Sequence, residues 1–469
     1  MHRFVPCVVL AALAGSAFAA PPVPPRQMVQ AEVSGDQTEW VRSWRADRND
    51  IIDGTPGIDR DPTSVLVKFR EDAPEEVIQF LKDLGGASTI QASFGIVPGL
   101  QHLAISGDLD ETIETLSQFG SWLDIVEYVE ADHVYHLHAT PNDTFYSLLW
   151  GMNNTGQTVN NDRGTANADI DANLAWDVTT GSASFVVGMA DSGILGTHED
   201  LAANIWTNPG EVAGNGVDDD GNGYVDDTWG WDFFNNDNNP TDDNGHGSHT
   251  AGTVGAVGNN GTGVAGVCWN VKLAGLKIGS ASGSVSVSAA VNAVNYCVGK
   301  GIKVANHSWG GGSFNQSLSN AISAARTAGH MLVCSAGNGG ADGRGDNNNT
   351  VPQYPAGYNF DNVISVAALD NDNKLARYSN YGSTSVDIGA PGSTVASCYN
   401  SSTTSYAYLS GTSMAAPHVT GAAALVWSVN PTWTYAQVRD KLYSSGKTVT
   451  ALVGKTVTGK SVNANNAVR

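Results

Sequence analysis

The sequence predicts an α/β fold in which a mostly parallel sheet lies between helices, preceded by a small α/β unit. Two observations predict it. From about residue 140 onward, short apolar runs alternate with helix-length segments, and polar residues follow several of these runs. Before that point, a strand–helix–strand–helix–strand pattern covers about residues 62–138. Strands that alternate with helices form parallel sheets covered on both faces, and 469 residues are enough for at least one large core.

Residues 1–20 are predicted to be a secretory signal. Arg3 supplies a positive start, Val5–Ala14 is an apolar run, and Ala17-Phe18-Ala19 is a small-x-small cleavage site. The run is too short for a membrane anchor, and no later segment offers about 18 uninterrupted apolar residues. We therefore expect a secreted, extracellular protein that is free of the membrane once the signal is removed.

Residues 21–139 are expected to form a linker and a compact unit with its core at about residues 62–138. Pro21-Pro22-Val23-Pro24-Pro25 is a stiff polyproline linker. Ser64–Phe69 alternates like a strand, and Ala73–Leu84 carries apolar residues at helical spacing. The later elements are a strand at His102–Ile105, a helix at Asp110–Phe119 and β-rich sequence at Ile125–Leu137.

The large unit is expected to span residues 140–469, because Thr140-Pro141-Asn142-Asp143 breaks the preceding pattern. Predicted strands are Phe185–Ala190, Val271–Ile278, Lys303–Asn306 and Met331–Ala336, and predicted helices are Ser288–Gly299, Asn315–Ala328 and Thr412–Val429. Polar groups follow three of these strands, at Asp191, Ser308 and Asn338. Because the carboxyl ends of parallel strands border the crevice of such a sheet, these groups are candidates for a functional site.

The chain is acidic, with 46 Asp and Glu against 24 Lys and Arg and a formal net charge of −22. This balance argues against nucleic-acid binding, which needs the opposite sign, and favours a soluble protein. The general acidity of secreted proteins explains most of the charge, and the binding of cations is the alternative interpretation. After Cys7 leaves with the signal, four cysteines remain: Cys268, Cys297, Cys334 and Cys398. An even number in an oxidising compartment allows disulfides in three pairings, among which the sequence does not choose. For Cys334, in an apolar run, a buried free thiol is an equal alternative.

Three short motifs supply the groups of an activated serine. They are Asp191-Ser192-Gly193, Gly245-His246-Gly247-Ser248-His249 and Gly411-Thr412-Ser413-Met414-Ala415-Ala416-Pro417-His418. A serine hydroxyl needs a neighbouring base, and His246 suits that role near neutral pH. Asp191 would hold the other ring nitrogen and stabilise the imidazolium. Ser413 begins a predicted helix, whose positive end favours an oxyanion at its amide, and Gly411 lets a substrate carbonyl approach.

These motifs, in the order Asp, His, Ser, resemble those of the subtilisin family of serine endopeptidases (subtilases) from about residue 140 to residue 469. The resemblance implies a subtilisin-like three-layer fold and an enzyme that hydrolyses polypeptides through an acyl-enzyme. It also implies a second oxyanion donor, Asn338. The small unit resembles the family's ferredoxin-like prodomain, an intramolecular chaperone and inhibitor, which would be removed by self-cleavage near His138–Thr140. A monomer is expected.

The same resemblance implies a set of substrate-binding residues. Ser308-Trp309-Gly310 matches one wall of the main specificity pocket and Tyr354-Pro355-Ala356 its floor, with Gln353 reaching into it. Gly283-Ser284-Val285 matches an edge strand that pairs with the backbone of an extended peptide. Ala336 and Gly337, which precede Asn338, complete the set. Since no acidic residue is clearly placed in this pocket, we expect broad cleavage after apolar or medium-sized residues instead of strict Lys or Arg specificity.

A Ca²⁺ site is predicted in the acidic stretch Asp218–Asp227. Oxygen ligands recur at alternate positions, as in an EF-hand loop with glycine at the sixth position. The expected ligands are Asp218, Asp220, Asn222, the Tyr224 carbonyl and Asp226. The closing Glu is absent because Trp229 stands at the twelfth position, and similar insertions in the family suggest Asp227 in its place. Nearby Glu211 adds to the repulsion that a cation would relieve, and a solvated turn is the alternative.

A second, structural Ca²⁺ site rests on the family resemblance. Asp143, Asp200 and Asn260 match family ligands, and the carbonyls of Val257, Thr262 and Val264 could add to them. The loop after His246 is one residue longer than in common subtilisins, which leaves the register of these ligands open.

Two other functions are compatible with parts of this sequence. A peptide ligase on the same fold would need an amine to outcompete water at the acyl-enzyme, and no insertion that would shield it is evident. A catalytically silent, calcium-dependent binding protein would not require an intact triad and Asn338. Gly411–Ala415 is not Gly-x-Ser-x-Gly, which argues against a lipase or esterase. Packing roles are expected for the other histidines singled out, namely His198, His249, His307, His330 and His418.

Overall fold

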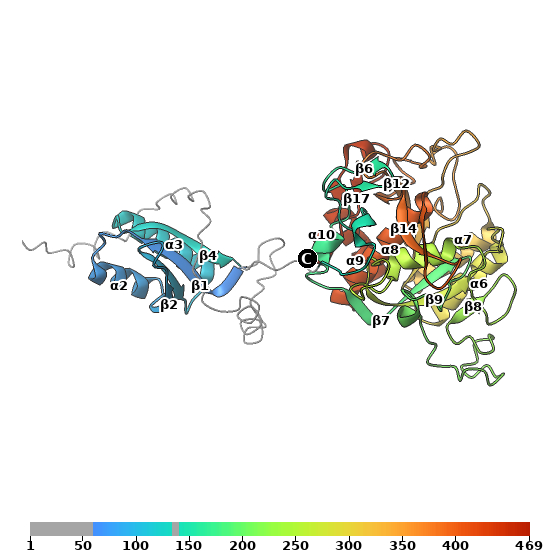
Figure 1. Cartoon of the computed structure of the whole chain (residues 1–469), viewed down its shortest axis with the longest axis horizontal. Coiled ribbons are helices and arrows are strands. Elements are labelled where there is room, and N and C mark those ends of the chain that lie inside the picture. The colour runs from blue at the N-terminus through green and yellow to red at the C-terminus, as the bar shows by residue number, and fades with distance from the viewer. Residues whose placement is uncertain (1–59, 134–139) are drawn as a thin grey trace, which may run out of the picture. The chain divides into compact units, whose positions relative to one another are not determined.

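The computed structural model describes residues 60–133 and 140–469, and the chain divides into two compact units between His136 and Leu137. The expected signal, the proline-rich linker and residues 138–139 of the expected cleavage segment lie outside the described residues. None of the described helices combines the length and the apolar composition that crossing a bilayer requires. In Figure 1 the small unit is coloured blue to cyan and the large unit green to red.

The small unit is a four-stranded antiparallel sheet with two helices. Its elements are β1 (Arg60–Phe69), α2 (Glu75–Leu84), β2 (Thr89–Ser93), β3 (Leu100–Ala104), α3 (Leu109–Trp122) and β4 (Val126–His133). The strand order β2-β3-β1-β4 and the βαββαβ succession are those of the expected ferredoxin-like fold. Both helices share one core, in which Leu81, Leu103 and Leu116 are fully buried. β2 was not predicted because it is short and mostly exposed, and its two apolar residues, Ile90 and Ala92, are too few to distinguish a strand from a loop.

A nine-stranded sheet forms the centre of the large unit, in the order β16-β17-β13-β12-β11-β10-β7-β9-β8. The strands are β7 (Gly181–Asp191), β8 (Gly230–Asp232), β9 (Asn270–Lys277), β10 (Val304–His307), β11 (Met331–Ser335), β12 (Val363–Leu369), β13 (Ile388–Pro391), β16 (Lys447–Thr448) and β17 (Lys460–Ser461). Neighbouring strands are parallel except β16 and β17. The prediction of a mostly parallel sheet is therefore confirmed. Two hairpins lie outside it, β5–β6 (Thr158–Val159 and Asp162–Arg163) and β14–β15 (Val395–Tyr399 and Ser405–Leu409).

Helices cover both faces of this sheet and complete the three layers (Figure 1). One face carries α4 (Ala172–Ala175), α5 (His246–Gly255), α8 (Thr412–Val429), α9 (Tyr435–Ser445) and α10 (Ala464–Val468). The other carries α6 (Val287–Gly299) and α7 (Gln316–Thr327). Short 3₁₀ turns occur at Tyr146–Leu148, Ala202–Asn204 and Thr450–Leu452.

The helix α8 runs through the core of the large unit. Almost every residue from Thr412 to Trp427 is buried, as expected for a helix that is apolar on all sides. Gly421 packs so closely that an added Cβ would lie 2.5 Å from the Cβ of Val267. This packing fixes the first turn of α8, where backbone N–H groups have no partner within the helix and Ser413 is the second residue.

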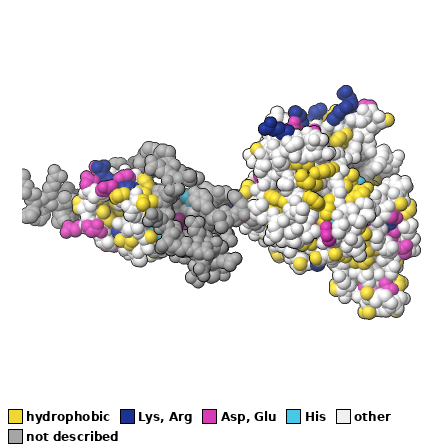
Figure 2. Space-filling view, in the orientation of Figure 1, with side chains coloured by type: hydrophobic (Ala, Val, Ile, Leu, Met, Phe, Trp, Pro, Cys, Tyr) yellow, Lys and Arg dark blue, Asp and Glu magenta, His cyan; other side chains and the backbone are white. Residues whose placement is uncertain are grey.

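Charged side chains are visible on the surface of both units (Figure 2). Some are buried in the large unit, however, including Asp191, Asp200, Asp227 and Asp242. Lys277 is also buried and pairs with Asp243 at 2.6 Å. Because an uncompensated buried charge is strongly unfavourable, each buried carboxylate marks a place where donors or a cation must balance it.

All four cysteines of the large unit are buried free thiols. The structure thus selects the free-thiol alternative for Cys334 and forms none of the three pairings. Burial raises the pKa of the Cys268 thiol to about 12 and raises the pKa of the other three thiols as well. A protonated, inaccessible thiol is chemically inert, so these cysteines are core residues.

Candidate active site

Three elements bring the predicted Asp, His and Ser to one edge of the large sheet. Asp191 is the last residue of β7, His246 the first of α5 and Ser413 the second of α8. Because α5 packs on both β7 and α8, the ends of these elements meet. Gly245 precedes α5 with φ 103°, and an added Cβ would lie 2.5 Å from the Tyr399 ring. Only glycine fits the turn that presents His246.

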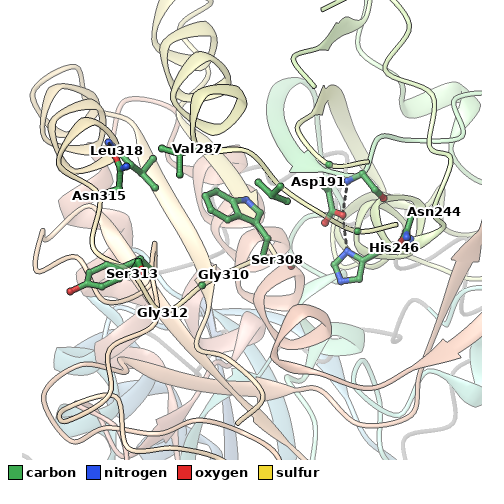
Figure 3. A pocket seen from close by; sticks show the side chains of 17 residues that line it. Asp191, Asn244, His246, Val287, Ser308, Gly310, Gly312, Ser313, Asn315 and Leu318 are labelled. Carbon is green, nitrogen blue, oxygen red and sulfur yellow. Dashed lines mark hydrogen bonds and ion pairs between the residues drawn. The ribbon is translucent and has the colours of Figure 1, made fainter. Parts of the chain in front are cut away.

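Asp191 and His246 form a hydrogen bond of 2.7 Å between Oδ1 and Nδ1 (Figure 3). The Asp191 side chain also accepts from Ser192 N at 2.8 Å and from the Thr250 hydroxyl at 3.0 Å. Held by three groups, the buried carboxylate keeps the imidazole in one orientation with its proton on Nδ1. The other ring nitrogen, Nε2, is then available to accept a proton.

The pKa of His246 lies above its ordinary value of 6.5. Burial lowers the pKa, but the charge and hydrogen bond of Asp191, with the charge of Asp242, raise it by more. A base must be neutral to accept a proton, so activity should rise as pH increases through this pKa. We expect kcat/KM for a peptide substrate to reach half of its maximum above pH 6.5. A pH–rate profile whose acidic midpoint lies at or below 6.5 contradicts this expectation.

Asp242 was not predicted, although it organises the turn that precedes His246. Its carboxylate accepts five hydrogen bonds of 2.6–2.9 Å, from the hydroxyls of Ser192 and Ser248 and from the backbone N–H groups of Asn244, Gly245 and Ser248. These bonds tie the β7 end to the start of α5. An Asp in a polar loop is so often an ordinary turn residue that the sequence alone gave no reason to select it.

Ser413 is placed near the expected partners but bonds elsewhere. Its hydroxyl donates to the Ser308 carbonyl at 3.1 Å, and the Ser308 hydroxyl donates to the Ser413 carbonyl at 2.7 Å. Within residues 60–133 and 140–469 no hydrogen bond joins Ser413 to His246, so the expected row of three is formed only between Asp191 and His246. The Ser308 carbonyl competes for the hydroxyl, and hydrogen bonds between catalytic groups are often loose without substrate.

Asn338 and the Ser413 amide border one small space. Asn338 Oδ1 accepts from Thr412 N at 2.8 Å and from the Thr412 hydroxyl at 2.9 Å, which leaves Nδ2 as the free donor of this side chain. A Cβ added to Gly411 would lie 3.4 Å from Asn338 Nδ2 and 3.6 Å from Ser413 N. Two N–H donors around one space suit the stabilisation of an oxyanion.

Gly411→Ala is expected to fill this space while the fold persists. Gly411 has an extended backbone (φ 163°, ψ 163°) that alanine adopts, and 3.4 Å is an ordinary contact distance. The added methyl would lie where the substrate oxygen must bind, so kcat should fall by about 100-fold. The melting temperature should change by no more than about 2 °C. Steady-state kinetics and thermal unfolding measure both, and an unchanged kcat contradicts the assignment.

A cleft of about 510 Å³ extends from Asp191 and His246 (Figure 3). The predicted residues that line it are Gly283, Val285, Ser308, Trp309, Gly310 and, from the predicted floor, Tyr354. Other lining residues were not predicted, among them Asn244, Val287, Asn315 and Leu318. Val287 begins α6 and Leu318 lies in α7. In the sequence their apolar side chains look like ordinary helix core positions, so only the tertiary fold reveals that they face a cleft.

The predicted edge strand Gly283–Val285 is a tight turn in the structure. Gly283 N donates to the Ser280 carbonyl at 2.8 Å, and Ser280 N donates to the Ser284 carbonyl at 2.9 Å. A single antiparallel bridge joins Gly279 to Val285. Gly283, with φ 80°, supplies the left-handed conformation that the turn needs. The segment therefore reaches the cleft at its two ends, while Ser284 does not line it.

Three further predicted substrate-binding residues are not among those that line the cleft, and neither are Asn338 and Ser413. Ala336 is fully buried and its N–H pairs with the Val366 carbonyl at 3.0 Å, which extends β11. Gly337 N donates to the Thr412 hydroxyl at 3.1 Å. The Cγ of Gln353 lies 3.1 Å from the position of a Cβ on Gly337. All three therefore support the segment of Asn338 and do not line the cleft.

In the acidic loop the structure groups three carboxylates whose oxygens lie within 4.8 Å of one another: Glu211, Asp218 and Asp220. Asp218 and Asp220 were predicted ligands, whereas Glu211 was predicted only as a neighbouring charge. Asp218 accepts from Asn222 N at 3.0 Å and from Gly223 N at 2.7 Å. Asp220 also pairs with Lys300 and accepts from the Asn208 amide at 3.0 Å, so part of the charge of this group is already balanced. Carboxylate oxygens are nevertheless the hard donors that Ca²⁺ takes.

Asp226 and Asp227, which were also predicted ligands, do not join the three. Asp226 accepts from Asn215 N at 3.1 Å and Gly216 N at 2.9 Å, because its backbone turns at φ 56°. Asp227 is fully buried and accepts from Tyr296, Asn222 and Asn208, with Lys300 at 3.4 Å. The Tyr224 ring packs on Trp231, Phe233 and Tyr296. Asp226 and Asp227 are thus balanced by protein donors.

The carboxylates of Asp143 and Asp200 both accept hydrogen bonds from the loop of residues 259–264. Asp143 Oδ2 accepts from Asn259 N at 2.7 Å, while its Oδ1 is buried and has no hydrogen-bond partner among the described residues. Asp200 accepts from the Asn260 amide and from Val264 N, both at 2.8 Å. Burial raises the pKa of both carboxyls. A buried, unpartnered carboxylate oxygen beside further oxygens fits a Ca²⁺ ligand set.

The other histidines have the packing roles that were expected. His249 Nε2 contacts the Val395 carbonyl at 2.9 Å, and burial lowers its pKa to about 3. His418 Nδ1 contacts the Met414 carbonyl at 2.8 Å, and burial lowers its pKa to about 4. The remaining three are also buried: His198, His307 and His330. None of the five lines the cleft.

Comparison with known proteins gives concordant matches. Residues 182–462 match the model of the Subtilase family. A thermophilic serine proteinase from Bacillus sp. (strain AK1) is 31% identical over 371 residues, which are 78% of this chain and 77% of that protein. Thermitase from Thermoactinomyces vulgaris is 37% identical over 289 residues, covering 62% and 86%. A solved protease structure from Pseudoalteromonas arctica PAMC 21717 has a TM-score of 0.57 and 30% identity, covering 70% of this chain and 99% of that one.

Proposed function

Because this chain belongs to the subtilase family, and is thus a serine endopeptidase that hydrolyses polypeptides, we propose that it is secreted, stabilised by Ca²⁺ and matured by removing its own small unit. The proposed catalytic residues are Asp191, His246 and Ser413, with Asn338 as oxyanion donor. The observation that carries the catalytic assignment is the 2.7 Å hydrogen bond between Asp191 and His246 at the end of the cleft.

The proposed reaction begins when Ser413 turns its hydroxyl from the Ser308 carbonyl to His246, by changing one rotamer. His246 Nε2 takes the proton while Oγ attacks the peptide carbonyl carbon. Asn338 Nδ2 and Ser413 N donate to the resulting oxyanion. The imidazolium, stabilised by Asp191, then gives its proton to the leaving amine as the C–N bond breaks. Water, deprotonated by His246, releases the acyl group from Ser413 and restores the enzyme.

Labelling with a serine-directed phosphonate tests this assignment. We expect the purified, processed protein to hydrolyse casein in the presence of Ca²⁺ and to lose that activity after the reagent binds. Peptide mapping should place a single adduct on the peptide that contains Ser413. An adduct on another serine contradicts the choice of nucleophile, and an absence of hydrolysis contradicts the proposed function.

The lining of the cleft supports broad specificity for apolar side chains. Trp309, Val285, Val287 and Leu318 contribute apolar surface. Asp191 is the one carboxylate among the lining residues, and it is bonded to His246. A substrate Lys or Arg would therefore find no free partner for its charge in this cleft.

Secretion and self-processing are supported by the order of the chain. The signal pattern at residues 1–20 is followed by a ferredoxin-like unit and then by the protease unit. A small unit in that position is the arrangement of a precursor whose N-terminal part assists folding and blocks the active site. The proposed cut near residues 138–140 would separate the two compact units, whose division lies between His136 and Leu137.

Ca²⁺ would be held by Asp143, Asp200 and Asn260 at one site and by Glu211, Asp218 and Asp220 at another. Its contribution would be structural, since it would neutralise carboxylates that are otherwise buried or crowded together. The unpartnered Oδ1 of Asp143 is the clearest support for the first site.

Chelation should lower the melting temperature of the mature enzyme by about 8 °C, because both sites lose their ion and each ligand at about 100 times its Kd adds roughly 2.7 kcal/mol, or about 4 °C for a unit of this size. Asp143→Asn should remove about half of this sensitivity, the share of the first site, because the site of Glu211, Asp218 and Asp220 is left unchanged. Without Ca²⁺ that variant should melt no lower than the wild type, since it no longer buries an unpaired carboxylate oxygen. Thermal unfolding of both proteins with Ca²⁺ and with EDTA measures this, and equal Ca²⁺ effects in the two refute the first site.

A further inference from the structure

The segment that carries Asn338 has little regular structure of its own. β11 ends at Ser335 and β12 begins at Val363. Gly337 and Gly339, on either side of Asn338, adopt φ 109° and φ 72°. Glycine restricts its backbone less than any other residue, so groups outside this segment must hold Asn338 in place.

Asn380 supplies hydrogen bonds on both sides of Asn338. Its backbone N–H donates to the Gly337 carbonyl at 2.9 Å, and its side-chain Oδ1 accepts from Gly339 N at 2.7 Å. The same Oδ1 accepts from Asp346 N at 2.8 Å, which closes the loop 339–346. Asn380 is 1% exposed and is 42 residues beyond Asn338 in the sequence. One side chain thus fixes the entry and the exit of the loop.

Asn348 links the Asn380 side chain to Ala336, the residue before Gly337. It accepts a hydrogen bond from Asn380 Nδ2 at 2.9 Å and donates from its own Nδ2 to the Ala336 carbonyl at 2.7 Å. Its backbone N–H donates to the Tyr381 carbonyl at 2.7 Å. Asn348 is 2% exposed. The bonds of Asn348 and Asn380 therefore reach Ala336, Gly337 and Gly339, which are the residues around Asn338.

The space around these amides is tightly filled. A Cβ on Gly337 would lie 2.6 Å from Asn380 Nδ2, and a Cβ on Gly345 would lie 1.8 Å from the Ser379 carbonyl. Ser379 is itself anchored to β12, because its hydroxyl accepts from Ala368 N at 2.8 Å. The asparagine pair therefore links the loop of Asn338 to a rigid strand of the sheet.

We propose that Asn348 and Asn380 are positioning residues of the oxyanion site, which act on catalysis by setting the place of the Asn338 side chain. The inference rests on the oxyanion role proposed for Asn338. Electrostatic stabilisation needs a donor at hydrogen-bond distance from the developing charge, and small displacements of such a donor are costly to the rate. Removing the Asn380 amide would leave Gly339 N and Asp346 N unpaired, and removing the Asn348 amide would leave the Ala336 carbonyl unpaired. Either change would free the loop to move.

The test is a double-mutant cycle on the secreted enzyme, assayed with a peptide p-nitroanilide that carries an apolar residue before the scissile bond. Asn380→Ala and Asn348→Ala should each lower kcat by about 10-fold or more, with KM within about 2-fold, because the oxyanion exists only after binding. In an Asn338→Ala background, adding Asn380→Ala should lower kcat by less than about 3-fold, because the donor being positioned is already gone.

Asn362→Ala is the matched control. Asn362 is 0% exposed and its amide also donates to two backbone carbonyls, those of Ile322 at 3.3 Å and His330 at 3.0 Å. It lies outside the oxyanion loop, so its replacement should lower the melting temperature without changing kcat by more than about 2-fold. If Asn380→Ala does not fold, Asn380→Asp replaces it, since aspartate keeps the acceptor for Gly339 and Asp346 and loses only the donor to Asn348.

Two results overturn the proposal: an equal loss of kcat from Asn380→Ala with and without Asn338, or an unchanged kcat in Asn380→Ala and Asn348→Ala. The proposed function fails separately. In that case Asn338→Ala alone leaves kcat unchanged, or the wild type does not hydrolyse the substrate.

Discussion

Replacing Ser413 with alanine is expected to lower kcat for peptide hydrolysis by about 10⁶-fold, the size of the loss when subtilisin loses its nucleophile. Ser413 provides the only atom that bonds to the substrate acyl carbon in the proposed mechanism. The substitution removes one half-buried hydroxyl at the first turn of α8, with its hydrogen bond to the Ser308 carbonyl, and leaves the buried remainder of this helix unchanged. The loss should therefore be chemical, with melting temperature changed by no more than about 2 °C.

The same variant tests self-processing. If Ser413 cleaves the chain near residues 138–140, the secreted Ser413→Ala protein should keep its full precursor mass, while the wild type is shortened. Adding a catalytic amount of active wild-type enzyme should restore cleavage, which shows that the site remains accessible. Normal maturation of Ser413→Ala expressed alone rules out self-processing.

Asp191→Asn is expected to lower kcat by about 10⁴-fold at neutral pH, the order of magnitude found when related catalytic aspartates are replaced. The carboxylate accepts a hydrogen bond from the Nδ1–H group of His246 at 2.7 Å. It also accepts hydrogen bonds from Ser192 N and the Thr250 hydroxyl. An amide of the same shape can donate to Nδ1, which moves the imidazole proton to Nε2, where a base must be free. The charge that raises the pKa of His246 is lost as well.

The acidic limb of the pH profile distinguishes this electrostatic effect from a loss of structure. In Asp191→Asn the residual activity should reach its midpoint at a lower pH than in the wild type, since the negative charge beside His246 is gone. Asp169→Asn is a matched control, because Asp169 and Asp191 are both 5% exposed and Asp169 likewise accepts from backbone N–H groups, those of Asn154 and Asp171. Its kcat should stay within about 3-fold of wild type. An unshifted midpoint in Asp191→Asn is incompatible with the role given to this carboxylate.

The sequence predicted those parts of the fold in which local pattern and burial agree. The helix at residues 412–429 has the predicted bounds because it is apolar on every side and begins after a glycine. The strand that leads to Asp191 was predicted because its buried C-terminal half is a continuous apolar run. β2, in contrast, is exposed with only two apolar residues, and β8 has only three residues, so each is too short to give a clear periodic signal.

Site residues that depend on distant contacts could not be predicted in the same way. Spacing alone suggested Asp226 as a calcium ligand, but its carboxylate turns back to Asn215 and Gly216, which no local pattern encodes. Glu211 joins Asp218 and Asp220 from outside the motif. Asn380 stands 42 residues from Asn338 in the sequence. Each of these contacts arises from loop conformation and tertiary packing, for which a single sequence offers no periodic or motif signal.

The four buried thiols of the large unit can be used to measure how often its core opens. With no disulfide among Cys268, Cys297, Cys334 and Cys398, a reducing medium has no bond to break in this unit and should leave the mature enzyme active. A chromogenic thiol reagent such as DTNB, which releases a coloured thiolate, can react with these sulfurs only when the molecule opens. The rate at which the mature, phosphonate-blocked enzyme reacts with this reagent therefore measures how often the native core opens. Ca²⁺ should slow the reaction to the extent that it stabilises the folded state.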